Sequence, residues 1–298
     1  MERDGNGWAR CAAGHRHWGR HGAAGLLLHA VDDSGVVRVL LQHRAPWSHH
    51  GDTWGLPGGA RDSHEDVVVA ALREAGEEAG LDPAAIRTRH GFVDDHGGWS
   101  YTTVYADVPA PVGTVANDES AALVWVPVNQ VDALNLHPGF ARTWPQARAR
   151  PTVLLVDAAN VVGARPDGWW RDRAGAAARL LDQVAGLRSV TVRGPGGATR
   201  VIAGAVAVLE GAASSAAAPD WVDVRRTPRG TSGDDVLAEA AARLVAQGKE
   251  VVAVSADRGL RARWAAQGQS SPPSTVSVVG PRWLLEQLEG ATTAPRTG

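Results

Sequence analysis

The alternation of apolar runs and polar breaks predicts two successive α/β domains. In the first half, apolar runs of strand length cover residues 23–31, 36–43, 86–93, 101–108 and 121–128. Asp32-Asp33-Ser34-Gly35 separates the first two runs and predicts a hairpin, because these residue types favour tight turns. One helix is predicted over residues 65–79, since its apolar residues recur at the spacing of a helical face. Ser63 or Asp62 is expected to cap its start, and Gly80 is expected to end it.

In the second half, strand-like and helix-like segments follow one another regularly. The strands are expected at residues 152–157, 189–193, 201–209, 250–255 and 275–279. The helices are expected at residues 173–184, 234–247, 258–266 and 281–288. Such alternation predicts a doubly wound parallel sheet with helices on both faces.

Length and histidine distribution support a division into two domains. A chain of 298 residues is long enough for two domains. All eleven histidines lie between His15 and His137, in the first half of the chain. The polar segment WPQARARP, residues 144–151, is bracketed by Trp and Pro and predicts a linker. We therefore predict a first domain over residues 1–148, with its core at about 20–145, and a second over 149–298, with its core at about 152–289.

Composition indicates a soluble protein without a membrane partner. The formal net charge of −2 gives no global field for nucleic acid or an anionic membrane, although a local groove could still bind one. The chain has no run of about 18 apolar residues and no apolar signal core near its start. Cys11 is the only cysteine, which excludes an internal disulfide and fits a reducing compartment. We expect a cytoplasmic protein, and the pattern leaves the oligomeric state open.

The predicted first-domain helix gathers three acidic side chains on one turn. Glu74, Glu77 and Glu78 stand at i, i+3 and i+4, so they share one face of the helix and repel one another. A hard cation reverses that repulsion, and Mg²⁺ or Mn²⁺ prefers carboxylate, water and phosphate oxygens. Gly58 and Gly59 precede the helix and allow the backbone to approach a ligand closely. The alternative is a solvated acidic face, but the spacing favours a cation site for phosphate chemistry.

The full spacing resembles the Nudix box, the signature of the Nudix hydrolases. Five residues separate Gly59 from Glu65, and seven more lead to Arg73-Glu74-Ala75-Gly76-Glu77-Glu78-Ala79-Gly80-Leu81, which matches every fixed position of the box. Trp54 and Pro57-Gly58-Gly59 are similar to the segment that precedes the box in MutT-type members. The resemblance covers about residues 20–145 and implies an α/β/α sandwich with a mixed sheet.

The resemblance also implies the chemistry of the first domain. Glu74, Glu77 and Glu78 are expected to bind Mg²⁺ or Mn²⁺, with Glu65 as an outer contributor and Arg73 as the residue that orients the carboxylates. The implied reaction is in-line attack of a metal-activated water on a phosphorus atom of a diphosphate. The substrate class would be a nucleoside di- or triphosphate.

Fewer residues indicate the general base and the substrate. Glu119, just before the strand at 121–128, is a candidate base in some MutT-like members, and an exposed loop acid is the alternative. Arg44, with His49 and His50, precedes the glycine loop and is a candidate for phosphate contact. The segment LHPGF, residues 136–140, is similar to MutT-like relatives, so an oxidised nucleotide such as 8-oxo-dGTP is the leading substrate hypothesis.

The N-terminal stretch carries potential metal ligands without a familiar zinc motif. Cys11, His15, His17 and His21 together could bind Zn²⁺. Because neither a second cysteine nor a C-x-x-C pair accompanies them, the sequence favours a polar arm over a metal site.

In the second domain, acidic residues follow the predicted strands. Asp157 and Asn160 follow the first strand, Asp257 follows the strand at 250–255, and Asp234 and Asp235 open a helix. Because the carboxyl ends of parallel strands line one edge of the sheet, these acids could hold Mg²⁺ or Mn²⁺ for phosphodiester cleavage. Helix and turn capping is the equally weighted alternative.

This half resembles the NYN branch of the PIN-like nucleases. The resemblance lies in D-x-x-N at Asp157–Asn160, GDD at Gly233–Asp235 and SADRGL from Ser255, although Ala158 stands where relatives often have Gly. It implies Asp157, Asn160, Asp234, Asp235 and Asp257 as site residues and RNA as a partner. Two alternatives to a nucleotide-clearing enzyme therefore stay open, namely an RNA-processing protein with a ribonuclease domain and a non-catalytic binding module.

Overall fold

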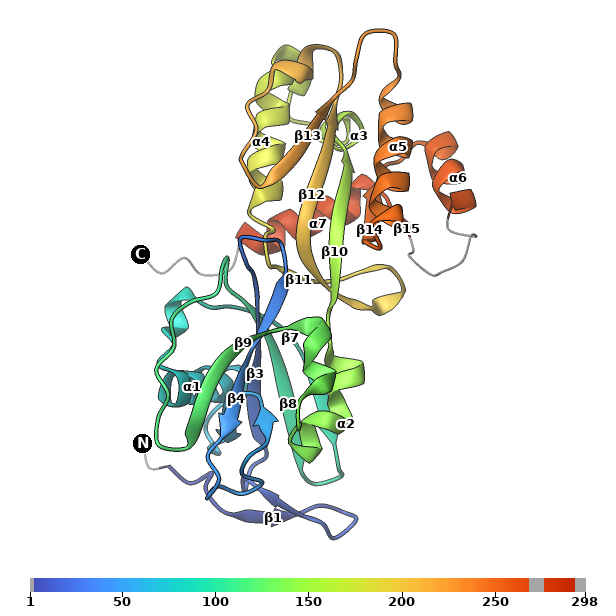
Figure 1. Cartoon of the computed structure of the whole chain (residues 1–298). Coiled ribbons are helices and arrows are strands. Elements are labelled where there is room, and N and C mark those ends of the chain that lie inside the picture. Colours follow the sequence, from blue (N-terminus) through green and yellow to red (C-terminus); the bar gives the residue numbers. More distant parts are fainter. Residues whose placement is uncertain (1–2, 268–275, 293–298) are drawn as a thin grey trace. The chain divides into compact units, whose positions relative to one another are not determined.

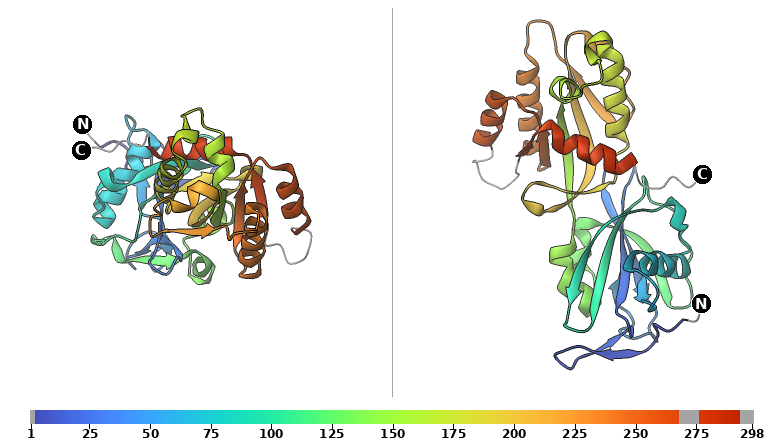
Figure 2. Two further views of the ribbon diagram at one scale, coloured as in Figure 1. Left: turned by 90° about the horizontal axis from the view of Figure 1, so that it is seen from above. Right: turned by 180° about the vertical axis from the view of Figure 1, so that it is seen from behind.

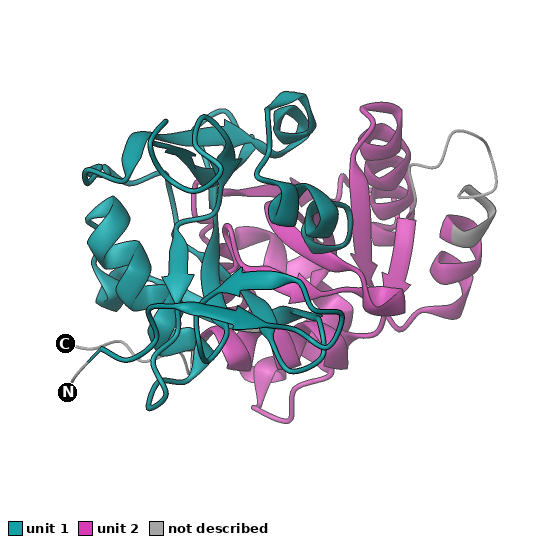
Figure 3. Cartoon of the chain, turned by 90° about the horizontal axis from the view of Figure 1, so that it is seen from below, with its two compact units in different colours: residues 1–148, 296–298 teal, residues 149–295 magenta. Residues whose placement is uncertain are grey.

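The computed structural model describes residues 3–267 and 276–292 of the chain. It divides into two compact units, of which the first ends at Arg148 and the second begins at Ala149 (Figure 3). Residues 268–275 and 293–298 of the second predicted domain lie outside the described ranges. Each unit has its own sheet and its own hydrophobic core, as expected of domains.

The first unit is built on a mixed sheet of seven strands. They are β3 (Ala23–Val31), β4 (Val37–Arg44), β5 (Trp54–Gly55), β6 (Gly58–Ala60), β7 (Arg87–Asp95), β8 (Ser100–Asp107) and β9 (Ser120–Pro127). The main path is β5-β4-β3-β8-β7, while β6 pairs with β3 and β9 pairs with β4. Only the β3–β8 pair is parallel within this sheet as described. The sheet brings β6, which leads into the glutamate helix, beside the start of β3.

The hairpin predicted at Asp32-Asp33-Ser34-Gly35 is confirmed. The strands β3 and β4 pair in antiparallel register, with Val31 opposite Val37. The Asp32 carboxylate accepts hydrogen bonds from the backbone N–H groups of Ser34 and Val36. Gly35 has a φ of 76°, in the left-handed region that glycine adopts without a steric penalty. The turn residues alone were therefore sufficient to predict this connection.

The glutamate helix α1 (Val67–Ala79) covers one face of the sheet (Figure 1). Along the chain it follows the loop after β6 and precedes the short helix η1 (Pro83–Ala85). Its apolar face packs on alternate residues of β3 and β8, including Leu26, Leu28 and Val104. The cap prediction was wrong, because Asp66 caps the helix by accepting hydrogen bonds from Val68 and Val69. Asp62 instead accepts the N–H of Gly5, at 2.6 Å.

A second helix, α2 (Pro138–Ala147), follows the short helix η2 (Val128–Ala133) on the other face of this sheet. Tyr105, which points away from α1 because side chains alternate along β8, donates a hydrogen bond from its hydroxyl to Ala147 O at 2.8 Å. Trp144 of this helix is fully buried. The prediction of a linker over residues 144–151 was wrong, since α2 runs through Pro145 and the next strand begins at Arg150. Pro138 and Pro145 hid this helix from the prediction, because proline usually marks a turn or the end of a helix.

A short antiparallel ribbon near the N-terminus was not predicted. It consists of β1 (Trp8–Arg10) and β2 (Arg16–Trp18), and Trp8 stands opposite Trp18. Strands of three residues carry too little periodicity to be recognised in the sequence.

The second unit contains a sheet of six strands. They are β10 (Arg150–Asp157), β11 (Thr191–Arg193), β12 (Thr199–Leu209), β13 (Val222–Arg226), β14 (Glu250–Val254) and β15 (Val276–Val279). The path is β11-β12-β10-β14-β15, and β13 also pairs with β12. All pairs are parallel except β11 with β12. The predicted parallel α/β sheet is confirmed, with an antiparallel strand β11 and an unpredicted strand β13.

Helices cover both faces of this second sheet (Figures 1 and 2). On one face lie α3 (Ala158–Gly163), α4 (Arg173–Ala185) and α7 (Pro281–Thr292), and on the other lie α5 (Gly233–Ala246) and α6 (Arg258–Gln267). Short 3₁₀ turns connect them at η3 (Trp169–Arg171), η4 (Pro195–Gly197) and η5 (Gly211–Ser215). Among the described helices of either unit, none combines the length and apolarity needed to cross a bilayer.

Candidate active site

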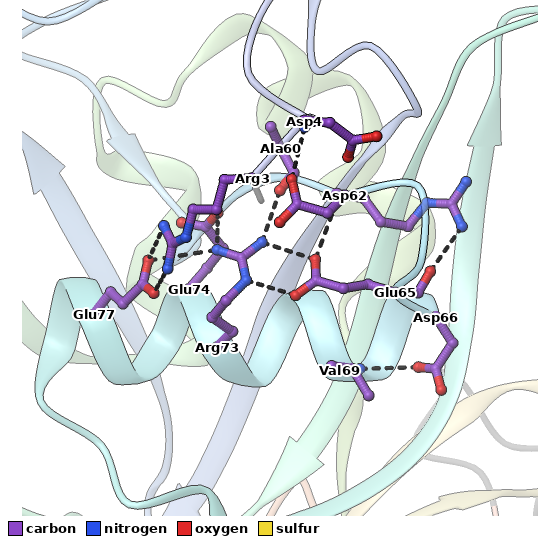
Figure 4. A network of polar contacts seen from close by, with 12 residues as sticks. Arg3, Asp4, Ala60, Asp62, Glu65, Asp66, Val69, Arg73, Glu74 and Glu77 are labelled. Atoms are coloured by element: carbon purple, nitrogen blue, oxygen red, sulfur yellow. Dashed lines mark hydrogen bonds and ion pairs between the residues drawn. The ribbon is translucent and has the colours of Figure 1, made fainter. Parts of the chain in front are cut away.

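The Arg73 guanidinium joins the two ends of the glutamate box. Its Nε and Nη2 donate to both carboxylate oxygens of Glu65, at 2.7 and 2.9 Å, and Nη1 donates to Glu74 at 2.7 Å. Nη2 also reaches Ala60 O at 2.9 Å, and Glu77 lies 3.4 Å from Nη1 (Figure 4). The pKa of Glu65 is lowered by this bidentate contact. The predicted orienting role of Arg73 therefore has a geometric basis.

Glu78 is the most deeply buried acid of the box. Only 4% of it is exposed, one carboxylate oxygen accepts the Gly58 N–H at 2.7 Å, and the other lies 3.2 Å from Gln42 Nε2. Burial raises the pKa of Glu78 to about 7, and the neighbouring Glu74 acts in the same direction. The Glu78 side chain therefore gains or loses its proton near neutral pH and has no ion-pair partner among the described residues, which is unusual for an acid with a purely structural role.

Two glycines allow the backbone to lie against these acids. A Cβ on Gly59 would stand 2.7 Å from the carboxylate atoms of Glu74, and a Cβ on Gly58 would stand 2.4 Å from Gly25 Cα. Burial also raises the pKa of Glu74, although Arg73 opposes this effect. A side chain at Gly59 would fill the space beside the Glu74 carboxylate, and one at Gly58 would collide with the backbone of β3, so both positions require glycine because of close approach.

Glu77 faces a different environment from its neighbours. Its side chain is 38% exposed and is bound by Arg3 and by Arg73 (Figure 4). Arg3 comes from the segment before β1, a contact that the sequence could not indicate because 74 residues separate the two side chains. Glu77 would have to exchange these guanidinium partners to bind a cation.

Polar side chains connect Glu78 with the loop before β9. Gln42 Nε2 donates to Ser120 Oγ at 2.8 Å as well as to Glu78. The backbone carbonyl of Glu119 accepts the Ala45 N–H at 2.9 Å, and its side chain is exposed. Glu119 therefore directly precedes Ser120, the residue whose hydroxyl Gln42 contacts. Sequence reasoning missed Gln42, because a buried Gln in an apolar strand carries no motif.

The candidate phosphate contacts also lie near this loop. Arg44 Nε donates to His49 O at 3.1 Å, and its charge acts on the pKa of Glu78. Ligand atoms of His49, His50 and His137 lie within 4.8 Å of one another. His137 was not singled out in the sequence, and burial lowers its pKa to about 4. Its ring nitrogen accepts the Gly139 N–H at the start of α2.

The donor types of the box suit a hard divalent cation, although Glu74, Glu77 and Glu78 are not one of the groups whose ligand atoms lie within 4.8 Å of one another in the described part of the chain. Glu74 and Glu78 are carboxylates with raised pKa values, and the space beside Glu74 is one that a Cβ would fill. Glu77 adds an exposed carboxylate one turn from Glu74 on the same helix. Such an oxygen donor set is the one that Mg²⁺ and Mn²⁺ prefer. Glu74, Glu77 and Glu78 would hold the ion, with Glu65 behind them through Arg73.

In the second unit, acids meet at the carboxyl ends of neighbouring strands. A cavity of about 80 Å³ is lined by polar residues and a few apolar ones, and its acids and amide are Asp157, Asn160, Glu210, Asp234 and Asp257. The central strand β10 ends at Asp157, and the chain crosses from one side of it (β12, β13) to the other (β14, β15). Ligand sites of open α/β sheets lie at such a switch point.

The individual acids of this cavity differ in their partners. Asp157 accepts hydrogen bonds from Asn160 N and from Ser255 Oγ, at 3.0 and 2.8 Å, and Asp257 caps α6 through Leu260 N. Burial raises the pKa of Asp234, and Asp257 and Asp157 contribute to that shift. Capping and clustering therefore occur together.

One predicted site residue lies outside this cavity, whereas Glu210, a weaker candidate at the end of the predicted strand 201–209, lines it. Asp235 does not line the cavity among the described residues, because its carboxylate pairs with Arg263 at 3.0 Å and with Ser232. Glu210 does line it, at the end of β12, and a Cβ on Gly233 would stand 2.7 Å from its Oε2. The structure brings together Asp157, Asn160, Asp234 and Asp257, but not Asp235.

Comparison with known proteins gives a consistent result for the first unit. A family model of the NUDIX domain matches residues 19–147. The chain is 51% identical over 159 residues to a protein of Mycobacterium tuberculosis named "Putative 8-oxo-dGTP diphosphatase 3", a match that spans 51% of this chain and 72% of that relative. It is also 43% identical over 156 residues to a "Nucleoside triphosphate pyrophosphatase/Nudix hydrolase fusion protein" of Bifidobacterium longum, over 50% of this chain and 32% of that protein.

Solved structures include similar chains. A crystal structure of a Nudix hydrolase from M. smegmatis, RenU, is 54% identical and covers 47% of this chain and 91% of its own, with a TM-score of 0.45. An Ap4A hydrolase of C. elegans is 21% identical and covers 42% of this chain and 93% of its own, with a TM-score of 0.35.

Proposed function

Because the chain belongs to the Nudix hydrolase family, we propose that its first unit hydrolyses a diphosphate bond in a nucleoside triphosphate, with an oxidised purine nucleotide such as 8-oxo-dGTP as the leading substrate. Pyrophosphohydrolase activity follows from the family. The observation that carries the proposal is the buried Glu78 carboxylate, which is held by the Gly58 N–H beside Glu74. The substrate proposal is supported by the name of the Mycobacterium tuberculosis relative.

The residues of the box divide the work of the proposed reaction. Mg²⁺ or Mn²⁺, when bound, would lower the pKa of water and neutralise negative charge on the phosphates. Arg73 fixes the direction of Glu74 by a hydrogen bond of 2.7 Å, while its other nitrogens are anchored on Glu65. Glu78 is held by Gly58 and Gln42, so its carboxylate cannot rotate freely. Arg44 lies near the same carboxylate and would contact the phosphates.

Two side chains are candidates for the general base. Burial raises the pKa of Glu78 to about 7, which suits it for accepting a proton at neutral pH provided that Glu74 and Glu77 hold the ion and Glu78 does not. Glu119 is exposed on the loop that Gln42 and Ser120 connect to Glu78, so it could reach the substrate from that loop. Glu119→Gln is the informative variant, because Glu119 is not among the proposed metal ligands, whereas Glu78→Gln removes a proposed ligand as well.

The test is hydrolysis of 8-oxo-dGTP and dGTP by the full chain with saturating Mg²⁺. We expect Glu78→Gln to lower kcat by at least about 10²-fold, since a positioned acid–base group contributes on that order. Glu239→Gln, an exposed acid on α5 paired with Arg243, is the control and should retain full activity. Wild-type rates in Glu78→Gln would remove the proposed mechanism. Preference for unoxidised dGTP would overturn the substrate assignment alone.

The second unit supports a second proposal, that of a metal-dependent ribonuclease of the NYN/PIN-like type. Its support is the gathering of Asp157, Asp234 and Asp257 around one cavity, with a raised pKa at Asp234. Mg²⁺ or Mn²⁺ at this edge would serve phosphodiester cleavage, with RNA as the partner. A non-catalytic binding module stays the alternative for this unit.

A cytoplasmic location of the protein is supported by the single cysteine.

A matched pair of variants tests this second proposal. The full chain is incubated with single-stranded RNA and Mn²⁺, and cleavage is expected in the wild type and to be lost in Asp234→Asn. Asp235→Asn is the control, because Asp235 neighbours it in sequence but pairs with Arg263 outside the cavity. Absence of cleavage in the wild type, with retained RNA binding, would favour the binding module.

A further inference from the structure

Three metal-ligating side chains meet outside the glutamate site. Cys11 directly follows β1, His17 lies on β2, and His96 lies in the turn between β7 and β8. One ligand atom of each lies within 4.8 Å of the others. Because Ala9 pairs with His17 across the ribbon, the period of two places Cys11 and His17 on the same face. That face turns toward Trp99, whose ring stacks on His17 with centroids 4.1 Å apart.

Two of these groups are buried without a hydrogen-bond partner. Cys11 is a free thiol of which 6% is exposed, and no partner of its sulfur occurs in the described part of the chain. Nε2 of His17 is buried and likewise has no partner among the residues described. An unsatisfied buried nitrogen costs about 1–3 kcal/mol, so its retention requires an explanation.

The third group, the His96 imidazole, has two polar side chains on the Nε2 side of its ring. Nε2 of His96 lies 3.0 Å from the Asp94 carboxylate, which also binds Arg142. Nε2 of His96 lies at the same distance from Arg142. These contacts occupy the Nε2 side of the ring and leave Nδ1 for another ligand. Histidines that bind metals commonly donate their second N–H to a carboxylate in this way.

We propose that Cys11, His17 and His96 bind one Zn²⁺ ion, with water in the fourth position. One thiolate and two imidazoles form a nitrogen and sulfur donor set, which suits Zn²⁺ and not the Mg²⁺ or Mn²⁺ of the glutamate site. The set differs from the one considered from sequence, because His21 lies 3.4 Å from Asp4 and His15 is exposed. His96 was recognisable only once the β7–β8 turn was placed beside the ribbon.

The ion would add a cross-link between the ribbon and the β7–β8 hairpin. The ribbon has strands of three residues, and such an isolated ribbon is marginal in water. Its tip contacts the β7–β8 turn through Ala12 N and Gly97 O, at 2.7 Å, and Ala9 and Cys11 of the ribbon segment belong to one apolar cluster with Ala23, Trp99 and Tyr101. The same segment carries Arg3, so fixing the ribbon also fixes the chain that reaches Glu77.

Cobalt titration of the full chain tests the site. Metal-free, reduced protein is saturated with Mg²⁺ and then titrated with CoCl₂. Since Cys11 is the only cysteine, a thiolate-to-cobalt charge-transfer band in the near ultraviolet reports this site and no other. We expect the band to saturate at about one equivalent and to disappear when ZnCl₂ is added, as for one metal per site. If the wild type takes up cobalt without this band, or takes up none, the proposal fails.

Variants then identify the imidazoles. His96→Gln should weaken cobalt affinity by more than about tenfold, whereas the control His21→Gln should leave it unchanged. Cys11→Ser should abolish the band. Circular dichroism establishes that each variant is folded, and ZnCl₂ should raise the Tm of the wild type but not of His96→Gln. Equal affinity of His96→Gln and wild type would overturn the assignment of His96. Because hydrolysis is not measured, the outcome is independent of the function proposed for the glutamate site.

Discussion

At the scale of single residues, Glu78 shows how burial adjusts an acid for metal binding. The ordinary pKa of 4.5 would leave it ionised at all physiological pH values, but burial raises it to about 7. In the unfolded chain the same carboxyl ionises near 4.5. The folded protein therefore loses stability as pH rises from about 4.5 to 7, because the unfolded chain releases this proton while the buried carboxyl retains it. A cation beside the carboxylate compensates this cost.

The first prediction concerns the pH dependence of metal binding at this residue. Below pH 7 a proton competes with the cation for Glu78, so Mg²⁺ affinity should fall by up to about tenfold per pH unit and level off above pH 8. Isothermal titration calorimetry at several pH values measures this, with release of a proton on binding at pH 6. Glu78→Gln is the control and should show a weaker, flatter profile. A wild-type affinity that is constant from pH 6 to 8 would contradict the prediction.

The second residue-scale prediction concerns a buried histidine far from any motif. His29 on β3 is completely buried, and burial lowers its pKa to about 4 from 6.5. Between these values the unfolded state binds the proton that the folded state excludes, so stability falls as pH falls from 6.5 to 4. The loss is on the order of 3 kcal/mol.

Chemical unfolding at pH 7.5 and pH 5 measures about 2 kcal/mol of this loss, because pH 5 lies above the folded pKa of about 4. In His29→Leu the part of the decline that belongs to this group should vanish, because the apolar side chain has nothing to protonate. His64→Leu, an exposed histidine in the loop before α1, is the matched control and should behave as the wild type. An unchanged acid sensitivity in His29→Leu would place the effect elsewhere.

At the scale of elements, the loop–helix unit of β6 and α1 depends on two different kinds of glycine. Gly59 is required by close approach, since a Cβ there would stand 2.7 Å from the Glu74 carboxylate. Gly76 lies inside α1, where a Cβ would stand 3.4 Å from Leu81 O, at ordinary van der Waals contact. The two positions are therefore predicted to respond in opposite ways to the same substitution.

The third prediction compares these two alanine variants. Gly59→Ala should displace Glu74 and lower kcat by roughly 10²-fold, as small displacements of catalytic groups do. Gly76→Ala should keep its activity and stabilise the protein by roughly 0.5–1 kcal/mol, because glycine is the poorer helix former. Thermal unfolding and steady-state hydrolysis measure both effects. Full activity in Gly59→Ala would show that Glu74 does not need its present position.

Sequence reasoning was most accurate for elements with a strong local signal. The predicted strand at 23–31 has the bounds of β3, and the predicted hairpin turn is present because Asp32 satisfies its own backbone neighbours. It failed where the local signal was ambiguous. Several side chains that can accept a hydrogen bond precede α1, so the sequence did not single out the cap. Asp66 caps the helix, whereas Asp62 accepts a hydrogen bond from Gly5, a residue distant in the sequence.

At the scale of the whole molecule, the two units have separate cores and separate candidate sites. In the first unit, α1 and α2 complete the two faces of the sheet before residue 148. The residues of the glutamate site lie between Arg3 and Ser120, and all of them belong to this unit. The proposed hydrolysis therefore requires no side chain from the second unit.

The fourth prediction is that a chain ending at Arg148 folds and hydrolyses the same substrate. Its kcat/KM should differ from that of the full chain by less than about twofold, which corresponds to under ~0.5 kcal/mol. A chain ending at Thr143 is the control and should unfold, because it lacks the fully buried Trp144 and the Ala147 carbonyl that Tyr105 binds. Loss of activity in the first truncation, with an intact fold, would assign the second unit a role in catalysis.

The periodic elements and the glutamate box could be identified from the order of residues alone. Both depend on neighbours within a few residues, for which spacing along the chain is also spacing in the structure. Only the tertiary structure decided the partners of those residues, such as Arg3 at Glu77, Gln42 at Glu78 and His96 beside Cys11. These contacts join residues 36 to 85 positions apart, and chain order does not encode such distances. The same holds for pKa values, because burial is a property of the packed molecule.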